Sequence, residues 1–399
     1  MTEHDRHDAG FKERTRVEAA RERLLDRVAV HDRTERVPLT EADGRTVATA
    51  VTAEQNVPHY RRAAMDGFAV RAEDTFGASD RSPAVLRENE AERVHTGSAL
   101  PEWADAVVMV EQANAASGEV ETFDAVGEGE NVAPVGEDVA EGDRLYEPGH
   151  RLRPSDLGLL KSVGLREVEV YERPEVAVIP TGEELVQDDP GPGEVVETNG
   201  LTVSRLAERW GASARYRDIV TDDEAALRDA IEADLDADVV VTTGGSSVGE
   251  RDLVPEVVED LGEVFVHGVA LRPGHPVALG EVDDTLVVML PGYPVACIVN
   301  AVQFLRPAVK RAGGMPIDDP PSVQARLDGK IRSEPGVRTF ARVRLREDGG
   351  ETVAEPVSAS GSGVLSSVAL ADGWVVVSEQ AEGIDDREGV AVQNWEAHR

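Results

Sequence analysis

The sequence predicts a multidomain α/β protein in which a doubly wound sheet is combined with β-rich regions. Strand-like and helical segments alternate across residues 175–312, and this alternation is typical of a doubly wound sheet. Residues 71–140 and 322–399 contain only short strand-like segments separated by turn-forming residues. These two regions therefore indicate a separate β module and a small β-barrel or sandwich. A chain of 399 residues is long enough for two to four domains.

The stretch 239–252, VVVTTGGSSVGERD, organises the predicted sheet. Its three consecutive valines indicate a strand covered on both faces. A loop of small residues is expected from Thr242 to Gly249, and a helix is expected to begin near Asp252. Three glycines in this loop permit positive φ and leave the backbone open to a ligand: Gly244, Gly245 and Gly249. Loop amides and a helix start form an anion site, and the loop also carries four hydroxyls. A nucleotide or phosphate site is therefore favoured over an ordinary turn.

Charge and composition exclude several classes of protein. The formal net charge is −36, and 37 of the 41 basic residues are arginine, because there are only four lysines. A surface this acidic argues against nucleic acid or an anionic membrane as partner. Because the acids are spread along the chain, they indicate a surface suited to high salt, as in a haloarchaeal cytoplasm, rather than an acidic tail.

The single cysteine and the apolar segments bound the compartment. Cys297 is the only cysteine, which excludes an internal disulfide and fits a reducing compartment. No apolar run is long enough to span a bilayer, and the charged N-terminus has no signal-peptide pattern. We therefore expect a cytoplasmic protein.

Three strand ends of the predicted sheet carry small residues. Strands are expected at 176–179, 239–241 and 286–290, followed by Thr181-Gly182, by the loop from Thr242, and by Pro291-Gly292. Ligands of doubly wound sheets bind beyond the carboxyl ends of the strands. We therefore expect these three turns to converge on one pocket. Helices are predicted at 15–30, 153–163 and 221–235, the last with a capping box formed by Thr221 and Glu224.

With these segments placed, the chain resembles the molybdopterin molybdenumtransferase family, which includes MoeA and the gephyrin E domain. The resemblance covers nearly the whole chain and rests on nine stretches in the family's order. They are VPHYRRAAMDGFAV, RVHTGSALPEWADAVVMVE, NVAPVGEDVAEGD, IPTGEELV, TTGGSSVGERD, LRPGHP, LPGYPV, PGVRTFARV and SGVLSSVALADGWVV.

The resemblance implies four domains and a homodimer. An elongated, discontinuous α+β domain is expected at 1–50 and 143–174, and a β-rich module at 51–142. An α/β molybdopterin-binding domain is expected at 175–314, and a C-terminal β-barrel at 322–399. The family's active site lies between the α/β domain of one subunit and the β module of the other.

The resemblance also implies an activity. Family members insert molybdate into adenylylated molybdopterin and release AMP, and tungstate is an alternative oxyanion. Cleavage of the pyrophosphate link calls for a divalent ion, expected to be Mg²⁺, held by hard oxygen ligands. Molybdopterin adenylyltransferase and acceptor molybdoenzymes are expected partners.

The matching positions supply the candidate site residues. The catalytic carboxylates implied by the resemblance are Asp66, Asp138, Glu184, Asp222 and Asp252, of which Asp222 and Asp252 are the expected metal ligands. The implied substrate-binding residues are Thr96, Gly97, Thr181, Gly182, Asn199, Gly244, Gly245, Ser246, Ser247, Gly249, Pro291 and Gly292. The implied oxyanion-binding residues are Arg272, His275, Arg342 and Ser366. Each carboxylate also has a structural interpretation, such as a helix cap for Asp252 or a dipole contact for Asp222.

The sequence departs from the family at the expected oxyanion site. Arg272 and His275 stand where the family often has two lysines, Tyr293 where many members have Asn, and Ala296 where Ser is common. The two prolines of LRPGHP are expected to aim Arg272 and His275 at one space, with nearby carboxylates favouring the charged histidine. Two other functions stay open at this stage: a molybdopterin adenylyltransferase, which needs only the α/β domain, and a non-catalytic binding or scaffold protein.

Overall fold

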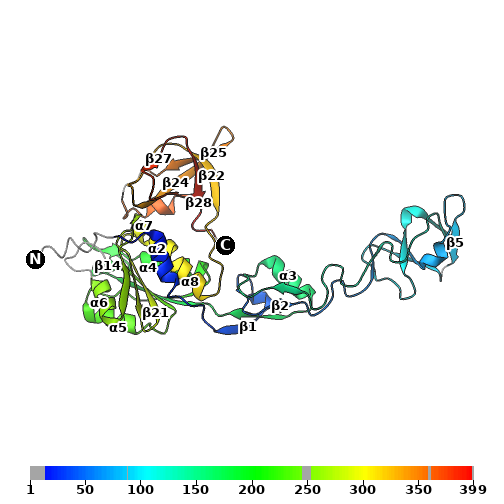
Figure 1. Ribbon diagram of the computed structural model, residues 1–399, viewed down its shortest axis with the longest axis horizontal. Coiled ribbons are helices and arrows are strands. Elements are labelled where there is room, and N and C mark those ends of the chain that lie inside the picture. Colours follow the sequence, from blue (N-terminus) through cyan, green and yellow to red (C-terminus); the bar gives the residue numbers. More distant parts are fainter. Residues whose placement is uncertain (1–13, 88, 245–252, 358–360, 398–399) are drawn as a thin grey trace, which may run out of the picture. The chain divides into compact units, whose positions relative to one another are not determined.

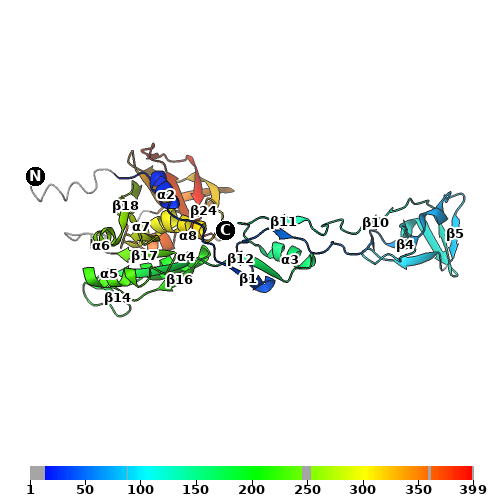
Figure 2. The same cartoon turned by 60° about the horizontal axis from the view of Figure 1, so that its bottom comes forward.

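The computed structural model describes residues 14–87, 89–244, 253–357 and 361–397. The chain forms two compact units. We call Glu35–Val170 the inserted unit, and Met1–Thr34 together with Tyr171–Arg399 the sheet-and-barrel unit. Figure 1 and Figure 2 show the secondary structure of each.

The six-stranded sheet of the sheet-and-barrel unit has the order β16-β13-β17-β21-β20-β18. Its parallel strands are β16 (Ser213–Tyr216), β13 (Glu175–Thr181), β17 (Val239–Gly244) and β21 (Thr285–Leu290). At one edge, β20 (Ala278–Val282) runs antiparallel to its two neighbours, β21 and the edge strand β18 (Glu263–His267). Strand β17 extends to Gly244, so the predicted loop start at Thr242 was wrong.

The antiparallel edge follows from a two-residue turn. Asp283 and Asp284 join β20 to β21 with φ of 47° and 68°, the backbone that a tight hairpin requires. Aspartate tolerates this left-handed conformation better than most residues. The prediction of a doubly wound domain is confirmed, with a hairpin added to its parallel part.

Helices cover both faces of this sheet (Figure 1). Val176 and Val178 of β13 pack with one set of helices, whereas Ala177 and Ile179 face the other. The first set comprises α2 (Val17–Leu25), α4 (Asn199–Arg209) and a continuous helix made of α7 (Pro294–Asn300), a π-helical turn (Ala301–Leu305) and α8 (Arg306–Ala312). The second set comprises α5 (Glu224–Glu232) and α6 (Leu253–Leu261). The alternation along β13 is the physical basis of the two layers.

Two predicted helix ends differ from the structure. Helix α2 ends at Leu25 rather than Val30, because the following valines, histidine and aspartate favour helix weakly; His31 N–H instead donates to Ala312 O at 3.1 Å. The capping box of Thr221 and Glu224 was wrong. The N-cap of α5 is Asp223, whose carboxylate accepts from Ala226 N–H at 3.0 Å. The packing of α2 also groups the residues before Glu35 with the sheet, whereas the expected domain boundaries assign them to the elongated domain.

A five-stranded barrel follows the last helix, which decides between the predicted barrel and sandwich. Pairing of β24 with β26 closes the order β24-β25-β22-β28-β26. These strands are β22 (Ser322–Leu327), β24 (Arg338–Asp348), β25 (Glu351–Pro356), β26 (Gly373–Val377) and β28 (Gly389–Gln393). Shorter elements are α9 (Ser366–Ala369) and the pair β23 (Ile331–Arg332) and β27 (Gly383–Ile384). Strand β19 (Leu271–Arg272) pairs in parallel with β24, so the LRPGHP segment lies against the barrel.

The inserted unit is built from small sheets. Its β module contains β4 (Gly67–Val70) between β6 (Ala91–Val94) and β7 (Ala106–Met109), and the sheet β5 (Ala84–Arg87), β9 (Glu119–Thr122) and β8 (Ala113–Ala116). Its only helical turns among residues 71–87 and 89–140 are 3₁₀ turns, Ala72–Thr75 and Val110–Gln112. Shorter pairs are β3 (Arg62–Ala63) with β10 (Val132–Ala133), β2 (Val51–Thr52) with β11 (Arg144–Tyr146), and β1 (Thr34–Pro38) with β12 (Glu167–Tyr171). Helix α3 (Pro154–Ser162) and the 3₁₀ turn Leu39–Glu41 complete it.

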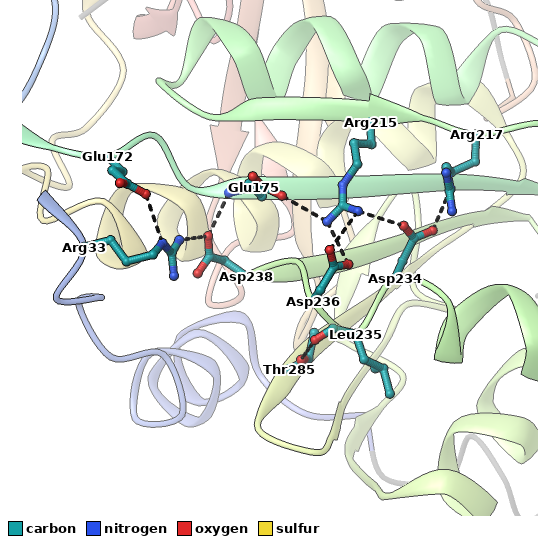
Figure 3. A network of polar contacts seen from close by, with 10 residues as sticks. All are labelled: Arg33, Glu172, Glu175, Arg215, Arg217, Asp234, Leu235, Asp236, Asp238 and Thr285. Carbon is teal, nitrogen blue, oxygen red and sulfur yellow. Dashed lines mark hydrogen bonds and ion pairs between the residues drawn. The ribbon is translucent and has the colours of Figure 1, made fainter. Parts of the chain in front are cut away.

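An ion network lies near the amino ends of β13 and β17 and reaches β16 through Arg215 and Arg217 (Figure 3). Arg33 donates to Asp238 at 2.6 Å and Arg217 donates to Asp234 at 2.8 Å. Three arginines meet five carboxylates here: Arg33, Arg215 and Arg217 with Glu172, Glu175, Asp234, Asp236 and Asp238. The excess of carboxylates reflects the composition of the chain and lies at the end of the sheet opposite the predicted pocket.

Candidate functional site

The carboxyl ends of β13, β17 and β21 lie side by side. Thr181 pairs in register with Gly244, and Thr243 pairs with Leu290. Gly244 has φ of +140°, and a Cβ on it would lie 2.0 Å from Thr181 O. A Cβ on Gly292 would lie 3.5 Å from the Gly244 Cα. The structure therefore brings the turns after all three strands together. At Gly244 the approach is so close that only glycine fits.

Asn199 joins the start of α4 to this edge. Its Nδ2 donates to Gly292 O at 2.7 Å, directly after the buried Pro291. Glu197, which is 5% exposed, accepts from Gly200 N–H at 2.6 Å and from the Tyr216 hydroxyl. Burial, followed by the bond to Glu197, raises the pKa of Tyr216. The two hydrogen bonds of Glu197 fix the first turn of α4 beside β13 and β16.

Polar atoms at this edge have no hydrogen-bond partner among the described residues. They are Thr181 Oγ1, Thr242 Oγ1, Thr243 Oγ1 and Asp222 Oδ1, all buried. Buried polar atoms in proteins are normally satisfied. These atoms therefore mark a place that further groups, from the chain or from a ligand, must fill.

Two of the predicted carboxylates meet here. Burial raises the pKa of Asp222, and the charge of Glu184 raises it further, while a hydrogen bond from the Glu183 backbone opposes the shift. Glu184 lies beside Gly182, where an added Cβ would lie 2.9 Å from Glu184 Oε2. The charge of Glu184 therefore disfavours the charged form of the buried Asp222.

Several predicted site residues lie outside the described part of the chain. They are the metal-ligand candidate Asp252 and the substrate-binding candidates Gly245, Ser246, Ser247 and Gly249. Within the described part of the chain, no group of three or more His, Cys, Asp or Glu side chains has metal-site geometry.

The LRPGHP turn is held by a residue that the sequence did not single out. Asn300 Nδ2 donates to Gly274 O at 2.8 Å and to Ala296 O at 2.9 Å. Arg272 Nη1 bonds Glu334 at 2.6 Å. Burial lowers the pKa of His275, and the charges of Arg14 and Arg272 lower it further. The charges of the two arginines thus act against the charged form of His275, whereas the sequence led us to expect carboxylates that favour it.

Arg342 and Ser366 lie on the barrel. Arg342 pairs with Trp374 across β24 and β26, and burial lowers its pKa. Ser366 is exposed and begins α9. The preceding loop reaches the start of α7, since Ser362 O accepts from Val295 N–H at 3.0 Å and a Cβ on Gly363 would lie 3.3 Å from the Tyr293 ring.

The inserted unit holds the other candidates. Asp66 Oδ1 accepts from Thr96 N–H at 2.7 Å and from Thr96 Oγ1 at 2.8 Å. These two bonds, followed by the neighbouring His95, lower the pKa of Asp66 despite its exposure. Gly97 has φ of +85°, which the turn after Thr96 requires. Asp138 is exposed, and its N–H donates to Val57 O at 2.9 Å.

Sequence reasoning missed Glu197, Tyr216 and Asn300. A sequence signal existed for Glu197. It follows an apolar pair and comes three residues before a glycine at a helix start, which is the spacing of a capping carboxylate. Tyr216 and Asn300 had none, since their partners are distant in the sequence or are backbone carbonyls.

Fold and site together define a doubly wound domain with a polar carboxyl edge, combined with a barrel and an inserted β module. The family model described as "Probable molybdopterin binding domain" matches residues 177–311. The MoeA N-terminal region (domains I and II) matches residues 15–164, and the MoeA C-terminal region (domain IV) matches residues 324–395.

Relatives match the chain along most of its length. The molybdopterin molybdenumtransferase of Haemophilus influenzae is 31% identical over 394 residues, covering 94% of this chain and 98% of that protein. That of Bacillus subtilis is 31% identical over 388 residues, covering 90% of this chain and 89% of that protein. The crystal structure of the molybdopterin biosynthesis MoeA protein from Pyrococcus horikoshii has a TM-score of 0.81 and 33% identity, and it covers 96% of this chain and 99% of its own. The chain belongs to the MoeA family of molybdopterin molybdenumtransferases.

Among the described residues, none of the helices combines the length and apolarity needed to cross a bilayer.

Proposed function

We propose that the protein is a molybdopterin molybdenumtransferase of molybdenum cofactor biosynthesis. One observation carries the proposal: the buried Asp222 Oδ1 has no hydrogen-bond partner among the described residues, at a carboxyl edge where Glu184 acts on its charge and Gly244 approaches Thr181 closely. Family membership supports the same reaction. The substrates are adenylylated molybdopterin and molybdate, with tungstate as an alternative oxyanion, and the products are AMP and the molybdenum cofactor.

Mg²⁺ fits the residues at this edge. Mg²⁺ prefers hard oxygen ligands, and Asp222 Oδ1 is a buried oxygen without a hydrogen-bond partner among the described residues. Asp222 and Glu184 would hold the ion together with Asp252, and the ion would neutralise charge that develops on the pyrophosphate link. Thr181 and Thr243 offer hydroxyls to the polar edge of the substrate, and Asn199 holds the Gly292 turn against it.

Arg272, His275, Arg342 and Ser366 are the proposed oxyanion residues. Arginine supplies positive charge and several donors to a tetrahedral oxyanion. The contact of the Ser362–Gly363 loop with Val295 and Tyr293 joins the barrel to the start of α7 within one unit.

The proposed reaction is tested by incubating the purified protein with AMP-molybdopterin, molybdate and Mg²⁺. AMP release coupled to cofactor formation is expected. Asp222→Asn should abolish most of the AMP release. Asp229→Asn, which replaces an exposed aspartate on α5, should not. Tight binding without turnover would instead indicate a scaffold protein. Transfer of AMP onto molybdopterin would indicate an adenylyltransferase.

We further propose a cytoplasmic homodimer in which two copies complete each site. The motivation is that Asp66 and Thr96 belong to the inserted unit, whereas Asp222 and Glu184 belong to the sheet-and-barrel unit. Mixing Asp66→Ala subunits with Asp222→Ala subunits should restore one intact site per heterodimer. If verified heterodimers stay inactive, the shared site is refuted. Molybdopterin adenylyltransferase and acceptor molybdoenzymes are the proposed partners.

A further inference from the structure

A small cavity lies inside the sheet-and-barrel unit, where α2 and α8 meet the barrel. Its volume is about 90 Å³. The polar side chains in its wall are Arg21, Gln303, Arg306, Asp319, Arg338 and Gln393. Three guanidinium groups therefore share this wall with one carboxylate.

Two of these arginines lack a carboxylate partner. Arg306 is 5% exposed, and its Nη2 donates to the backbone oxygen of Asp318 at 2.7 Å. Among the described residues, no carboxylate lies within 4.0 Å of the guanidinium nitrogens of Arg21 or Arg306. Because buried charges are normally paired, we expect an anion beside these two guanidinium groups.

Donors at the cavity are also unused. Arg21 Nε and Arg338 Nε are buried without an acceptor among the described residues. The Nη2 atom of Arg338 is engaged by Glu379 at 3.0 Å and by Glu18. Gln393 Oε1 accepts from Trp374 Nε1 at 3.1 Å, which leaves the Gln393 amide NH₂ as a donor, because an indole N–H can only donate.

Carboxylates also act on the arginines of the cavity. Glu18 and Glu379 engage Arg338. Burial is the main cause that lowers the pKa of Arg21 and of Arg306, and Asp319 opposes the shift in both. Arg338 lowers the pKa of Arg21 further, and Arg21 lowers that of Arg306. The observation that points to a ligand is therefore the pair of buried Nε donors, on Arg21 and Arg338, that have no acceptor among the described residues.

We propose that this cavity binds a small inorganic anion, either a halide or a tetrahedral oxyanion. The volume is about three times the ~30 Å³ that a water molecule occupies in the liquid, which is too small for a nucleotide or a pterin. Guanidinium groups match oxyanions through several parallel donors. Because the wall comes from α2, α8 and the barrel, a bound anion joins the N-terminal helix to the C-terminal domain.

Thermal unfolding under controlled anion composition tests the proposal. Sodium gluconate, whose anion is too large for the cavity, is replaced at constant ionic strength by sodium chloride in one series and by sodium sulfate in another. Ligand that binds only the folded state raises its stability with the logarithm of concentration above Kd. The wild-type Tm should rise with one of the two anions, and the series that responds identifies a halide or an oxyanion.

Two variants and one control make the test specific. Arg21→Gln and Arg306→Gln should move the anion dependence to at least tenfold higher concentration. Arg209→Gln, an arginine 45% exposed on α4, should respond as wild type does. Should the buried Arg306 variant fail to fold, the half-buried Arg21 carries the test. Identical responses of Arg21→Gln and Arg209→Gln to both anions would show that the cavity holds only water and would overturn the proposal.

Discussion

Asn199 Nδ2 donates to Gly292 O at 2.7 Å and thereby joins two turns that are 93 residues apart in the sequence. One turn begins α4 and the other follows β21. Because Gly292 also lies against Gly244, this one bond positions two of the three turns at the carboxyl edge.

Replacing Asn199 should therefore disturb substrate binding more than folding. Asn199→Ala leaves the Gly292 carbonyl without its donor, a loss of about 1.4 kcal/mol, or roughly tenfold in kcat/KM. Steady-state kinetics of AMP release provide the measurement. Asn114→Ala, at an exposed position of β8, is the control and should keep wild-type constants. A tenfold effect in both variants would disconnect the Asn199 contact from the site.

Asp222→Asn should raise thermal stability while slowing AMP release by roughly 100-fold, the usual scale for a lost electrostatic contact at a reaction centre. Burial and Glu184 raise the folded-state pKa of Asp222. The folded state consequently holds the proton more tightly, so stability is greatest below the unfolded value of 3.8 and is lost as pH rises through the raised value. The Tm gain of Asp222→Asn over wild type should thus appear at neutral pH and vanish in acid.

Magnesium separates the two roles of this aspartate. Added Mg²⁺ should raise the Tm of wild type at pH 7, because it binds the charged pair, and should leave Asp222→Asn unchanged. Asp229→Asn is the matched control on α5. An equal response of all three proteins to Mg²⁺ would leave Asp222 with only its contact to the dipole of α5.

The sheet was the most predictable part of the chain. Buried parallel strands require apolar runs, and the valines at 239–241 and the residues at 286–290 supplied them. Glycine at strand ends signalled the close approach of Gly244 to Thr181. Both signals are local in the sequence, which is why they could be read there.

What escaped prediction depends on neighbours distant in the chain. The pKa of His275 is lowered by burial and by Arg14, which comes from the N-terminal segment. The buried arginines around Phe340 come from α2, α8 and β24, and periodicity marks those positions only as polar. The Asp283-Asp284 pair could have predicted the hairpin turn. Because acidic pairs are frequent in this chain, however, the pair carried little information.

The Asp66–Thr96 pair gives a prediction for the inserted unit. The backbone N–H and the hydroxyl of Thr96 lower the pKa of Asp66. Thr96→Val removes the hydroxyl and keeps the N–H, so the pKa of Asp66 should rise but stay below the ordinary value of 3.8. Titration of the Asp66 carboxyl ¹³C shift measures it, with Thr52→Val as an exposed control on β2. A pKa unchanged by Thr96→Val would show that the hydroxyl does not hold the carboxylate.

The stability that Asp66 contributes has a defined pH window. Since its folded pKa is lowered, that contribution is present above the unfolded value of 3.8 and is lost as pH falls through the lowered value. The same ¹³C titration reports the window directly.

His275 makes oxyanion binding depend on pH. Burial, Arg14 and Arg272 lower its folded pKa below the unfolded value of 6.5, so the free protein holds it neutral at pH 7. Its contribution to stability is complete above 6.5 and falls as pH drops through the lowered value, because the unfolded chain takes up the proton first. A bound oxyanion favours the protonated ring, so binding takes up a proton.

The molybdate KM of wild type should therefore rise as pH increases, by up to tenfold per pH unit, and level off once the bound histidine is neutral. His275→Lys places an ordinary pKa of about 10.4 at the same position, so its KM should stay low to higher pH even with Arg14 and Arg272 nearby. His267→Lys, exposed on β18, is the control and should follow wild type. Turnover measured across pH at fixed high salt checks this, and parallel profiles for wild type and His275→Lys would remove His275 from the oxyanion site.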